Sequence, residues 1–359
     1  MIIHTLELHH FRNYSHVEVA FSPELNFIQG NNGQGKTNIV EALYYLCNLD
    51  SFRTRKILPL LQNQQEFALL KSSIERKNVL YAIQINLSKK GKKVLLNQKH
   101  SRKTSEHILS FISIAFTPED VNLFRSIPNE RRRFFDRTLS FVDSSYFFDM
   151  QELNQILAQK NALLKRKNIG QLPIWNELLS KISQKVGKQR HAFVVAINRH
   201  LTGYFRKMTG RSEKLLLTYQ PSFGEETYHN QQQMNEALQR IMERELNYGH
   251  TLLGPHRDDY RLFLDNKGDR DFFSQGELRI TNLSLKMSIN QLLSERYSFY
   301  PVLIFDDLFS ELDPKVNGKV LQFFSELKNQ IFITSTDVPP NLTLHGKTIH
   351  IANGQLSHC

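Results

Sequence analysis

The feature that most constrains this chain is a phosphate-binding loop motif close to its N-terminus. Residues 30–37 read GNNGQGKT and match G-x-x-x-x-G-K-[ST] at every required position. The segment follows a short apolar run and opens a helical pattern, so backbone N–H groups and a helix N-terminus can surround phosphates. Lys36 would reach the β- and γ-phosphates, and the Thr37 hydroxyl would ligate Mg²⁺. A glycine-rich turn before a helix is the plainer alternative. The residues of this loop predicted to bind ATP are Gly30, Asn31, Asn32, Gly33, Gln34, Gly35, Lys36, Thr37 and Asn38.

A second nucleotide-related pattern lies near the C-terminus, where residues 302–307 read VLIFDD. An apolar strand that ends in carboxylates suits a Walker B element, because the buried strand fixes an acid beside Mg²⁺. Asp306 is therefore predicted to be the metal-side acid, together with Thr37. Asp307 and Lys36 are the predicted catalytic residues, since Asp307 can orient or polarise an attacking water. Other ABC-type ATPases have Glu there, and the shorter Asp side chain predicts slow turnover. Without the P-loop, this pattern would be only a strand end.

The order of two further segments favours the ABC type of P-loop ATPase, in which two subunits complete each other's sites. Ser274, Gln275 and Gly276 precede a helical pattern and the Walker B strand. A hydroxyl, a glycine backbone and a helix N-terminus suit the γ-phosphate of an ATP that the other subunit holds. Asp313 would lie in a D-loop that contacts that subunit, and residues 334–336 would take the place of the switch residue, without its usual His. Alone, the Ser-Gln-Gly segment is a common helix-capping turn. The pattern predicts a homodimer that forms with ATP.

The hydrophobic pattern divides the chain into a nucleotide-binding head in two halves and an inserted helical lobe. From residue 144 onward, apolar residues at helical spacing predict three helices before Gly210 and another over 231–247. We therefore expect an α/β fold, an ABC-type ATPase head (P-loop NTPase) at 1–143 and 251–359 with a mainly helical lobe at 144–250. KKGKK at 89–93 predicts a hairpin turn around Gly91. The predicted strands are 2–8, 17–21, 25–28, 69–74, 80–87, 93–96, 261–264, 302–305, 330–334 and 348–351, with helices over 37–49 and 278–294.

The positive charge of the chain is concentrated in two segments. The net charge is +11, yet residues 150–214 hold 13 Lys and Arg against 3 Asp and Glu, and residues 71–103 hold 10 against 1. The remainder is net negative, so the basic segments favour a polyanionic partner and predict contacts to DNA phosphates without base recognition. Solvated charged faces are the alternative. The residues predicted to contact DNA are Lys89, Lys90, Lys92, Lys93, Lys165, Arg166, Lys167, Lys181, Lys185, Lys188 and Arg190.

Composition favours a globular protein of the cytoplasm with no membrane partner. No apolar run approaches the length of about 18 residues that a membrane span needs. The start of the chain alternates apolar and polar residues and lacks the features of a signal peptide. The two cysteines, Cys47 and Cys359, are too few for a disulfide framework or a zinc site, and they suit a reducing compartment.

Taken together, these segments resemble the RecF family of ABC-type, SMC-like head proteins, nearly from end to end. The resemblance implies that Arg12 and Asn13 lie near the nucleotide and that residues 118–120 take the Q-loop place, although no Gln stands there. Glu277 departs from the Gln that the family often has. For the cluster of three Arg residues at 131–133, a buried structural role and a DNA contact remain open. The matching segments are HFRNY at 10–14, GNNGQGKTN at 30–38, FTPED at 116–120, RRRFFD at 131–136, GPHRDD at 254–259, SQG at 274–276 and DDLFSELD at 306–313.

The resemblance also implies an activity. It implies ATP-dependent dimerisation on double-stranded or gapped DNA, slow DNA-stimulated ATP hydrolysis, and assistance to RecA loading with RecO and RecR in recombinational gap repair. A transporter ATPase subunit is the nearest rival, but it needs grooves for membrane coupling helices in place of a basic helical insertion. A recruitment platform, in which ATP sets the dimer state and hydrolysis only resets it, is a second alternative. A P-loop kinase is a third, and it would not need the SQGE and SELD segments.

Overall fold

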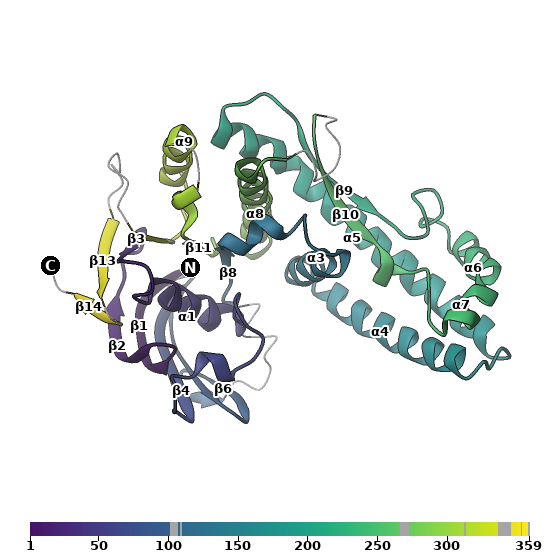
Figure 1. The fold of residues 1–359 in the computed structure, drawn as a ribbon, viewed down its shortest axis with the longest axis horizontal. Helices are drawn as coiled ribbons and strands as arrows, with labels where there is room; N and C mark the ends of the chain where they lie inside the picture. Colours follow the sequence, from purple (N-terminus) through teal and green to yellow (C-terminus); the bar gives the residue numbers. More distant parts are fainter. Residues whose placement is uncertain are drawn as a thin grey trace. The chain divides into compact units, whose positions relative to one another are not determined.

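The computed structural model describes residues 1–100, 107, 110–265, 273–311, 314–336, 346–352 and 354–357. The chain forms two compact units (Figure 1). Unit 1 comprises residues 1–120, 207–209 and 293–359, and unit 2 comprises residues 121–206 and 210–292. Among the described residues, no helix combines the length and the apolar character that crossing a bilayer requires.

Unit 1 contains an antiparallel sheet with strand order β2-β1-β4-β5-β6-β7. Its strands bury alternate side chains: in β1, Leu6 and Leu8 are fully buried, whereas Glu7 and His9 remain partly exposed. The expected hairpin turn is confirmed, since Ser88 pairs with Gly91 and Gly91 has a φ of 132°. The strands are β1 (Ile2–Phe11), β2 (Tyr14–Ala20), β4 (Phe67–Arg76), β5 (Val79–Ser88), β6 (Gly91–Leu96) and β7 (Lys99–His100).

A second sheet of unit 1 has the order β14-β13-β3-β12-β11-β8 and is parallel from β13 to β8. Its central strands are continuous apolar runs, as expected for strands covered on both faces. Helix α1 contacts this sheet and also β4, so the core of the unit lies between the two sheets and α1. Because the strands are parallel, the carboxyl ends of β3, β11 and β12 meet at one edge. The elements are β3 (Leu25–Gln29), α1 (Lys36–Asn48), η1 (Leu58–Leu60), β8 (Ser113–Phe116), β11 (Val302–Asp306), η5 (Leu308–Glu311), α9 (Pro314–Ser325), β12 (Ile331–Ser335), β13 (Gly346–Ala352) and β14 (Gln355–Ser357).

Unit 2 is mainly helical, with one antiparallel pair of strands, β9 and β10. Helices α4 and α5 run side by side in opposite directions, joined by an ion pair between Asp149 and Lys185 and by hydrogen bonds from Gln189 to Asp143 and Asp149 (Figure 1). The elements are η2 (Pro118–Asn122), which crosses from unit 1, α3 (Pro128–Val142), α4 (Ser144–Lys165), α5 (Leu172–Thr209), β9 (Leu215–Gln220), α6 (Gln231–Arg240), α7 (Met242–Tyr248), η3 (Pro255–Arg257), β10 (Asp259–Leu264) and α8 (Gln275–Tyr297).

Unit 2 is wider than the helical lobe predicted at 144–250. It comprises residues 121–206 and 210–292, because α3 packs on β10 and β9 pairs with β10 over residues 215–220 and 259–264. The second and third predicted helices form the single helix α5, whose buried face continues from Leu179 through Val186 to Phe205. The helix predicted over 231–247 is instead two helices that meet at Ile241.

Candidate nucleotide-binding site

The P-loop lies at the carboxyl end of β3 and leads into α1, as its motif predicts. Lys36 Nζ donates hydrogen bonds to the backbone carbonyl oxygens of Gly30 at 2.5 Å and Asn31 at 3.0 Å, so the ammonium group lies within the loop. Burial lowers the pKa of Lys36, while the carboxylates of Asp307 and Asp306 act in the opposite direction. An ammonium group held in this loop can neutralise phosphate oxygens that enter it.

Two glycines are required by the close packing of this loop. A Cβ atom at Gly30 would collide with the backbone carbonyl oxygen of Ile351 in β13. Gly35 has a φ of 115°, and a Cβ atom there would lie 2.7 Å from Asn13 Nδ2 and from the Tyr14 hydroxyl. Packing against β13 and the β1–β2 turn therefore favours glycine at both positions, in addition to any contact with phosphate.

Side chains from three segments meet at the carboxyl end of β11. Thr37 Oγ1 donates to Asp306 Oδ1 at 2.9 Å, and Thr334 Oγ1 donates to the same oxygen at 2.7 Å. Thr334 Oγ1 also accepts a hydrogen bond from the backbone N–H of Asp307 at 2.9 Å. Burial raises the pKa of Asp306, and the two hydroxyl hydrogen bonds oppose that rise. A carboxylate and a hydroxyl at this separation suit a hard divalent cation, so Thr37 and Asp306 fit the ligands expected for Mg²⁺.

The β1–β2 turn brings Asn13 against the P-loop. Asn13 Nδ2 donates to the carbonyl oxygen of Gln34 at 3.2 Å, and its Oδ1 accepts from Asn38 Nδ2 at 2.7 Å. Arg12 instead forms a two-point ion pair with the buried Glu41, at 2.8 and 2.6 Å. This pair holds the turn against α1, and a direct contact between Arg12 and a nucleotide stays a prediction.

The Ser-Gln-Gly segment of unit 2 starts helix α8 and caps it. The backbone N–H of Ser274 donates to Glu277 Oε2 at 3.0 Å, and the backbone N–H of Glu277 donates to Ser274 Oγ at 3.2 Å, which is a capping box. Glu277 also pairs with Arg211 at 2.8 Å. Burial acts to raise the pKa of Glu277, but the bonds to Arg211 and Ser274 outweigh it and the pKa is lowered. Asp313, the other residue predicted to contact a partner's ATP, lies outside the described residues.

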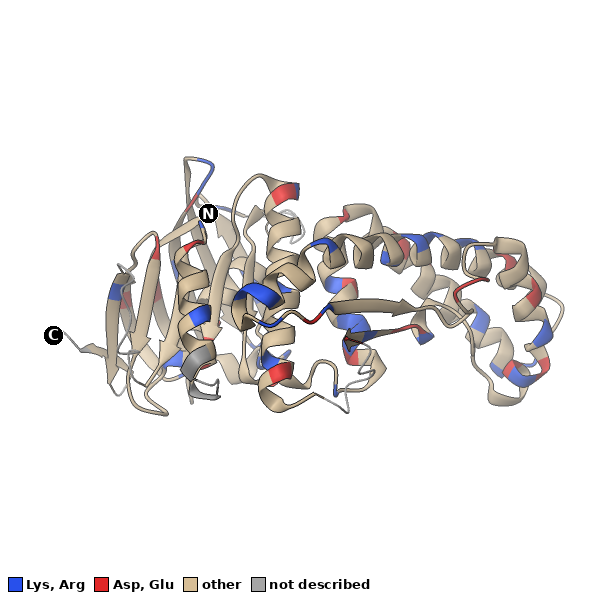
Figure 2. Ribbon diagram, turned by 90° about the horizontal axis from the view of Figure 1, so that it is seen from above, with Lys and Arg blue, Asp and Glu red and all other residues tan. Residues whose placement is uncertain are grey.

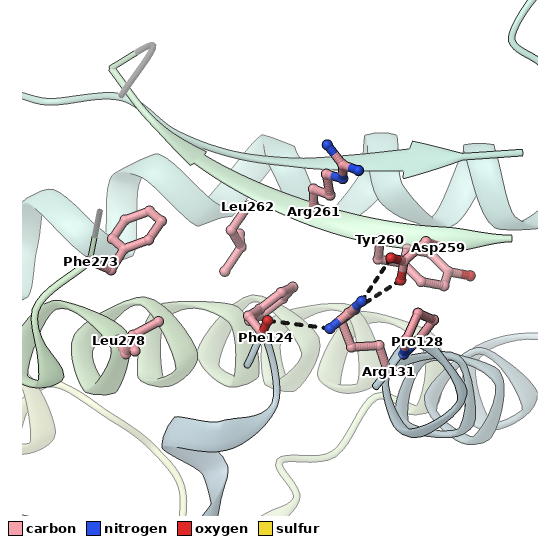
Figure 3. A pocket seen from close by; sticks show the side chains of 9 residues that line it. All are labelled: Phe124, Pro128, Arg131, Asp259, Tyr260, Arg261, Leu262, Phe273 and Leu278. Atoms are coloured by element: carbon pink, nitrogen blue, oxygen red, sulfur yellow. Dashed lines mark hydrogen bonds and ion pairs between the residues drawn. The ribbon is translucent and has the colours of Figure 1, made fainter. Parts of the chain in front are cut away.

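A cavity of about 250 Å³ lies within unit 2 beside this segment. Figure 3 shows Phe273 and Leu278, which flank the segment, at one end of the cavity, with Leu262 of β10 between them and Arg261. At its polar end, Arg131 donates to both carboxylate oxygens of Asp259, at 2.8 and 2.7 Å (Figure 3). No P-loop residue is among the described residues that line this cavity, so it is separate from the predicted ATP site.

The RRRFFD and GPHRDD segments meet in unit 2. Arg131, which is 3% exposed, pairs with Asp259, and Arg132 donates to the backbone carbonyl oxygen of Asp258 at 2.7 Å. Arg133, by contrast, is exposed. A buried cation without its partner is costly, so these contacts assign Arg131 a structural role and favour one for Arg132. Of the three, Arg133 is the most accessible to a polyanion, and Arg132 is half-buried.

The structure corrects one predicted DNA contact, Arg190. Its side chain is fully buried, and it pairs with Asp136 at 2.9 Å and Asp258 at 2.7 Å while Nε donates to the Tyr146 hydroxyl at 2.8 Å. A guanidinium group enclosed in this way cannot meet a DNA phosphate. The reason is its position on the apolar face of α5, between Val186 and Phe193.

The other predicted DNA contacts have exposed side chains. Lys92 Nζ donates to the carbonyl oxygen of Leu49 at 2.5 Å, and Lys185 pairs with Asp149 at 2.6 Å, so these two ammonium groups already have protein partners. In Figure 2, basic positions recur along the helices of unit 2 with acidic positions between them. The exposed residues are Lys89, Lys90, Lys92, Lys93, Lys165, Arg166, Lys167, Lys181, Lys185 and Lys188.

Sequence reasoning missed several residues that support the site. It expected a hydroxyl near residue 334 in the switch position but did not predict that Thr334 connects Asp306 to Asp307. It also missed Arg53, which donates to Asn38 Oδ1 at 2.8 Å. In the expected Q-loop place, Asp120 accepts from the backbone N–H of Thr117 at 2.6 Å. These contacts join residues that are distant in sequence or lie in irregular segments, and no spacing pattern signals them.

A P-loop after β3, a carboxylate at the end of β11 in the same sheet and a Ser-Gln-Gly helix start define the chain as an ABC-type ATPase head. The family model for the RecF/RecN/SMC N terminal domain matches residues 2–345. The chain is 34% identical to the DNA replication and repair protein RecF of Bacillus mycoides (strain KBAB4) over 373 residues, which cover 99% of this chain and 98% of that protein. It therefore belongs to the RecF family, and the resemblance inferred from its motifs is confirmed.

Solved structures agree with this assignment. The recombination mediator protein RecF of the RecFOR pathway, solved with ATP, has a TM-score of 0.87 at 27% identity and covers 99% of this chain and 97% of its own. The same protein with ATPrS has a TM-score of 0.85 at 28% identity with the same coverage. An Smc head bound to the C-winged helix domain of ScpA, at 16% identity and a TM-score of 0.60, shares the fold. The predicted ABC-type head fold is confirmed.

Proposed function

We propose that this chain is an ATP-dependent DNA-binding ATPase of DNA replication and recombinational gap repair. The observation that carries the proposal is the meeting of Thr37 from the P-loop with Asp306 from the Walker B strand, at 2.9 Å. That contact joins the two motifs into one site for a nucleotide and its cation. The RecF relatives are named DNA replication and repair proteins, and RecF structures were solved with ATP and ATPrS, which supports the same role here.

In this proposal Lys36 binds the β- and γ-phosphates, and Thr37 and Asp306 hold Mg²⁺, which would draw charge from the phosphate oxygens when bound. The other P-loop residues, Gly30 to Asn38, surround the phosphates with backbone N–H groups, and Asn13 fixes the loop. Asp307 orients the attacking water. Its side chain is short, so hydrolysis should be slow.

The same proposal includes an ATP-induced homodimer. Ser274, Gln275, Gly276 and Asp313 of one subunit would contact the γ-phosphate of the ATP held by the other. The position of Ser274 at the start of α8 supports this, because a helix N-terminus suits an anion, which would there replace the capping box of Ser274 and Glu277. RecO and RecR are the expected partners and RecA loading the expected outcome, because the related RecF structures belong to the RecFOR pathway.

DNA would bind the exposed basic side chains through its phosphates. Lys89, Lys90 and Lys93 on the β5–β6 hairpin form one group, and Lys92 is adjacent to them. The second group is on unit 2 and consists of Lys165, Arg166, Lys167, Lys181, Lys185 and Lys188. Dimerisation would place two copies of each group on one duplex, so ATP should tighten DNA binding.

The experiment that tests the proposed activity is binding and hydrolysis of ATP by Lys36→Met. Loss of the ammonium group should abolish ATP binding or hydrolysis, because the positive charge that would neutralise the β- and γ-phosphates is removed. Lys56→Met, an exposed position of the same unit, is the matched control and should behave as wild type. ATP binding and hydrolysis at wild-type levels by Lys36→Met would contradict the proposal.

A further inference from the structure

Three side chains with metal-binding atoms gather on the outward face of the antiparallel sheet in unit 1. Glu7 and His9 of β1 and His16 of β2 each offer one ligand atom, and these atoms lie within 4.8 Å of one another. Glu7 Oε1 is 2.6 Å from His9 Nε2. The His9 and His16 rings stack with their centroids 4.5 Å apart. The three groups therefore converge at one point on the surface of the sheet.

The strand register explains why they converge. His9 pairs directly with His16 across β1 and β2, so the two imidazoles project from the same face. Glu7 precedes His9 by two residues and thus points to that face as well. Glu18 pairs with Glu7 across the strands and is exposed, which places a second carboxylate beside the first. The strand register therefore brings these side chains to one face of the sheet.

We propose that Glu7, His9 and His16 form a binding site for a divalent transition-metal ion of the Zn²⁺ class. Two imidazole nitrogens and a carboxylate oxygen are a common three-residue set for Zn²⁺, and the remaining position would take water or Glu18. Imidazole ligands favour transition metals, whereas Mg²⁺ prefers oxygen ligands. This site is therefore distinct in chemistry from the Mg²⁺ position expected at Thr37 and Asp306.

One residue opposes metal binding and provides a sharp test. Lys71 Nζ lies 3.0 Å from Glu7 Oε1, so its ammonium group competes with a cation for the same carboxylate. The Lys71 side chain is 42% exposed, and its removal should leave the sheet intact. The metal site should therefore bind more tightly when Lys71 is replaced by an uncharged residue.

The position of the site suggests what the ion does. His9 and His16 lie on either side of the β1–β2 turn that carries Asn13 to the P-loop. An ion that joins the two strands would hold this turn in place. Binding to the folded chain alone would raise its stability by mass action, which appears as a rise in Tm that depends on Zn²⁺ concentration.

The test is a titration of the full chain with Zn²⁺, using a competing chelator dye to measure affinity and Co²⁺ absorption to report the geometry of the ligands. His16→Ala should weaken Zn²⁺ binding by about tenfold or more, the loss that even outer-shell substitutions cause at metal sites. His4→Ala is the matched control, because His4 of the same strand pairs with Glu75 at 2.9 Å without belonging to the cluster. Lys71→Met should tighten binding and increase the shift in Tm.

Four outcomes would overturn the proposal. They are no Zn²⁺ binding by the wild-type chain, an equal loss in His4→Ala and His16→Ala, no gain in Lys71→Met, and displacement of the bound ion by millimolar Mg²⁺. Lys36→Met should retain the Zn²⁺ site. The proposal is thereby tested independently of ATP binding.

Discussion

The P-loop region of unit 1 and the Ser-Gln-Gly segment of unit 2 differ in how their polar side chains are hydrogen-bonded within the chain. In unit 1, Thr37 and Thr334 come from two segments and both donate to Asp306 of a third, so the two side chains expected to hold a cation already meet. In unit 2, the hydroxyl of Ser274 accepts from the backbone N–H of Glu277, and the Glu277 carboxylate accepts in return. The P-loop region thus brings together the side chains expected to bind a ligand. In the Ser-Gln-Gly segment, the polar groups of Ser274 and Glu277 are hydrogen-bonded to each other in a helix cap.

The difference shows what each unit needs in order to function. A nucleotide that enters the P-loop can replace the hydrogen bonds of Lys36 to two carbonyl oxygens with contacts to phosphate oxygens of opposite charge. A γ-phosphate that approaches Ser274 must instead compete with a capping box, whose loss costs about 1 kcal/mol. We therefore expect ATP to bind unit 1 first and the contact with unit 2 of another subunit to follow.

The largest expected effect concerns unit 2 and its buried network. Arg190→Met would remove the guanidinium cation that pairs with Asp136 and Asp258 and should lower the free energy of unfolding by about 3–5 kcal/mol. Lys188→Met, an exposed position on the same helix, should change it very little. Chemical denaturation of both variants measures the difference. If Arg190→Met kept its stability but lost DNA binding, the original prediction of a DNA contact would be right and the structural assignment wrong.

The next largest effect should be that of an Asp307 substitution on the rate of ATP hydrolysis. Asp307→Asn should retain ATP binding and slow the chemical step by about 10²-fold or more, because the amide cannot accept a proton from the attacking water. The variant should accumulate the ATP-bound state. Single-turnover hydrolysis measures the rate, with Glu24→Gln as an exposed control in the same unit. A wild-type rate for Asp307→Asn would remove this residue from the mechanism.

The effect of Asp306→Asn on Tm should have opposite signs without and with ATP and Mg²⁺. Burial raises the pKa of Asp306 in the folded chain above its unfolded value, so the group stabilises the fold only below the unfolded pKa, and that contribution is lost as pH rises through the folded pKa. Asp306→Asn should therefore raise the Tm of the nucleotide-free protein at neutral pH, and less so in acid. With ATP and Mg²⁺ the wild type should be the more stable of the two. A Tm scan across pH with both proteins tests this, and a lower Tm for the variant at neutral pH without nucleotide would contradict it.

The smallest expected effect is on the stability of unit 2, when the capping box of the Ser-Gln-Gly segment is removed. Its measurement tests the capping role of the segment separately from its proposed role in a dimer. Ser274→Ala should lower the stability of unit 2 by about 1 kcal/mol through loss of the cap. Glu277→Gln should cost less, because Gln also completes a capping box. Denaturation curves of the two variants measure this order. Equal stability of Ser274→Ala and wild type would show that the cap contributes nothing.

Local patterns were enough to predict the parts of the molecule that depend on neighbours in sequence. Alternation located β1, β2, β4 and β5, and the P-loop motif located the turn into α1, because side-chain direction and backbone conformation follow from adjacent residues. The connection of Thr334 to Asp306 was not predictable in this way. It requires β12 to lie between β3 and β11, which is a property of the sheet order.

The burial of Arg190 could have been predicted from the helical spacing of the apolar residues around it. Ile182, Val186, Phe193 and Ile197 follow helical spacing on the buried face of α5, and Arg190 falls on the same face, whereas Lys181, Lys185 and Lys188 lie on exposed positions. Counting charge alone placed all four in one group. The extent of unit 2 differs from the predicted lobe for another reason, since the pairing of β9 with β10 joins strands that are distant in sequence and no local pattern reveals it.

The most direct test of the proposed dimer-completed site is hydrolysis by a mixture of two inactive variants. Lys36→Met removes the P-loop contact, and Ser274→Arg blocks the segment that would contact a partner's ATP. If each site uses the P-loop of one subunit and Ser274 of the other, a mixed dimer has one site with both defects and one intact site. An equal mixture should then recover about one quarter of wild-type hydrolysis, because half of the dimers are mixed and each has one of two sites. No recovery in the mixture, or full activity of Ser274→Arg alone, would contradict a site shared between subunits.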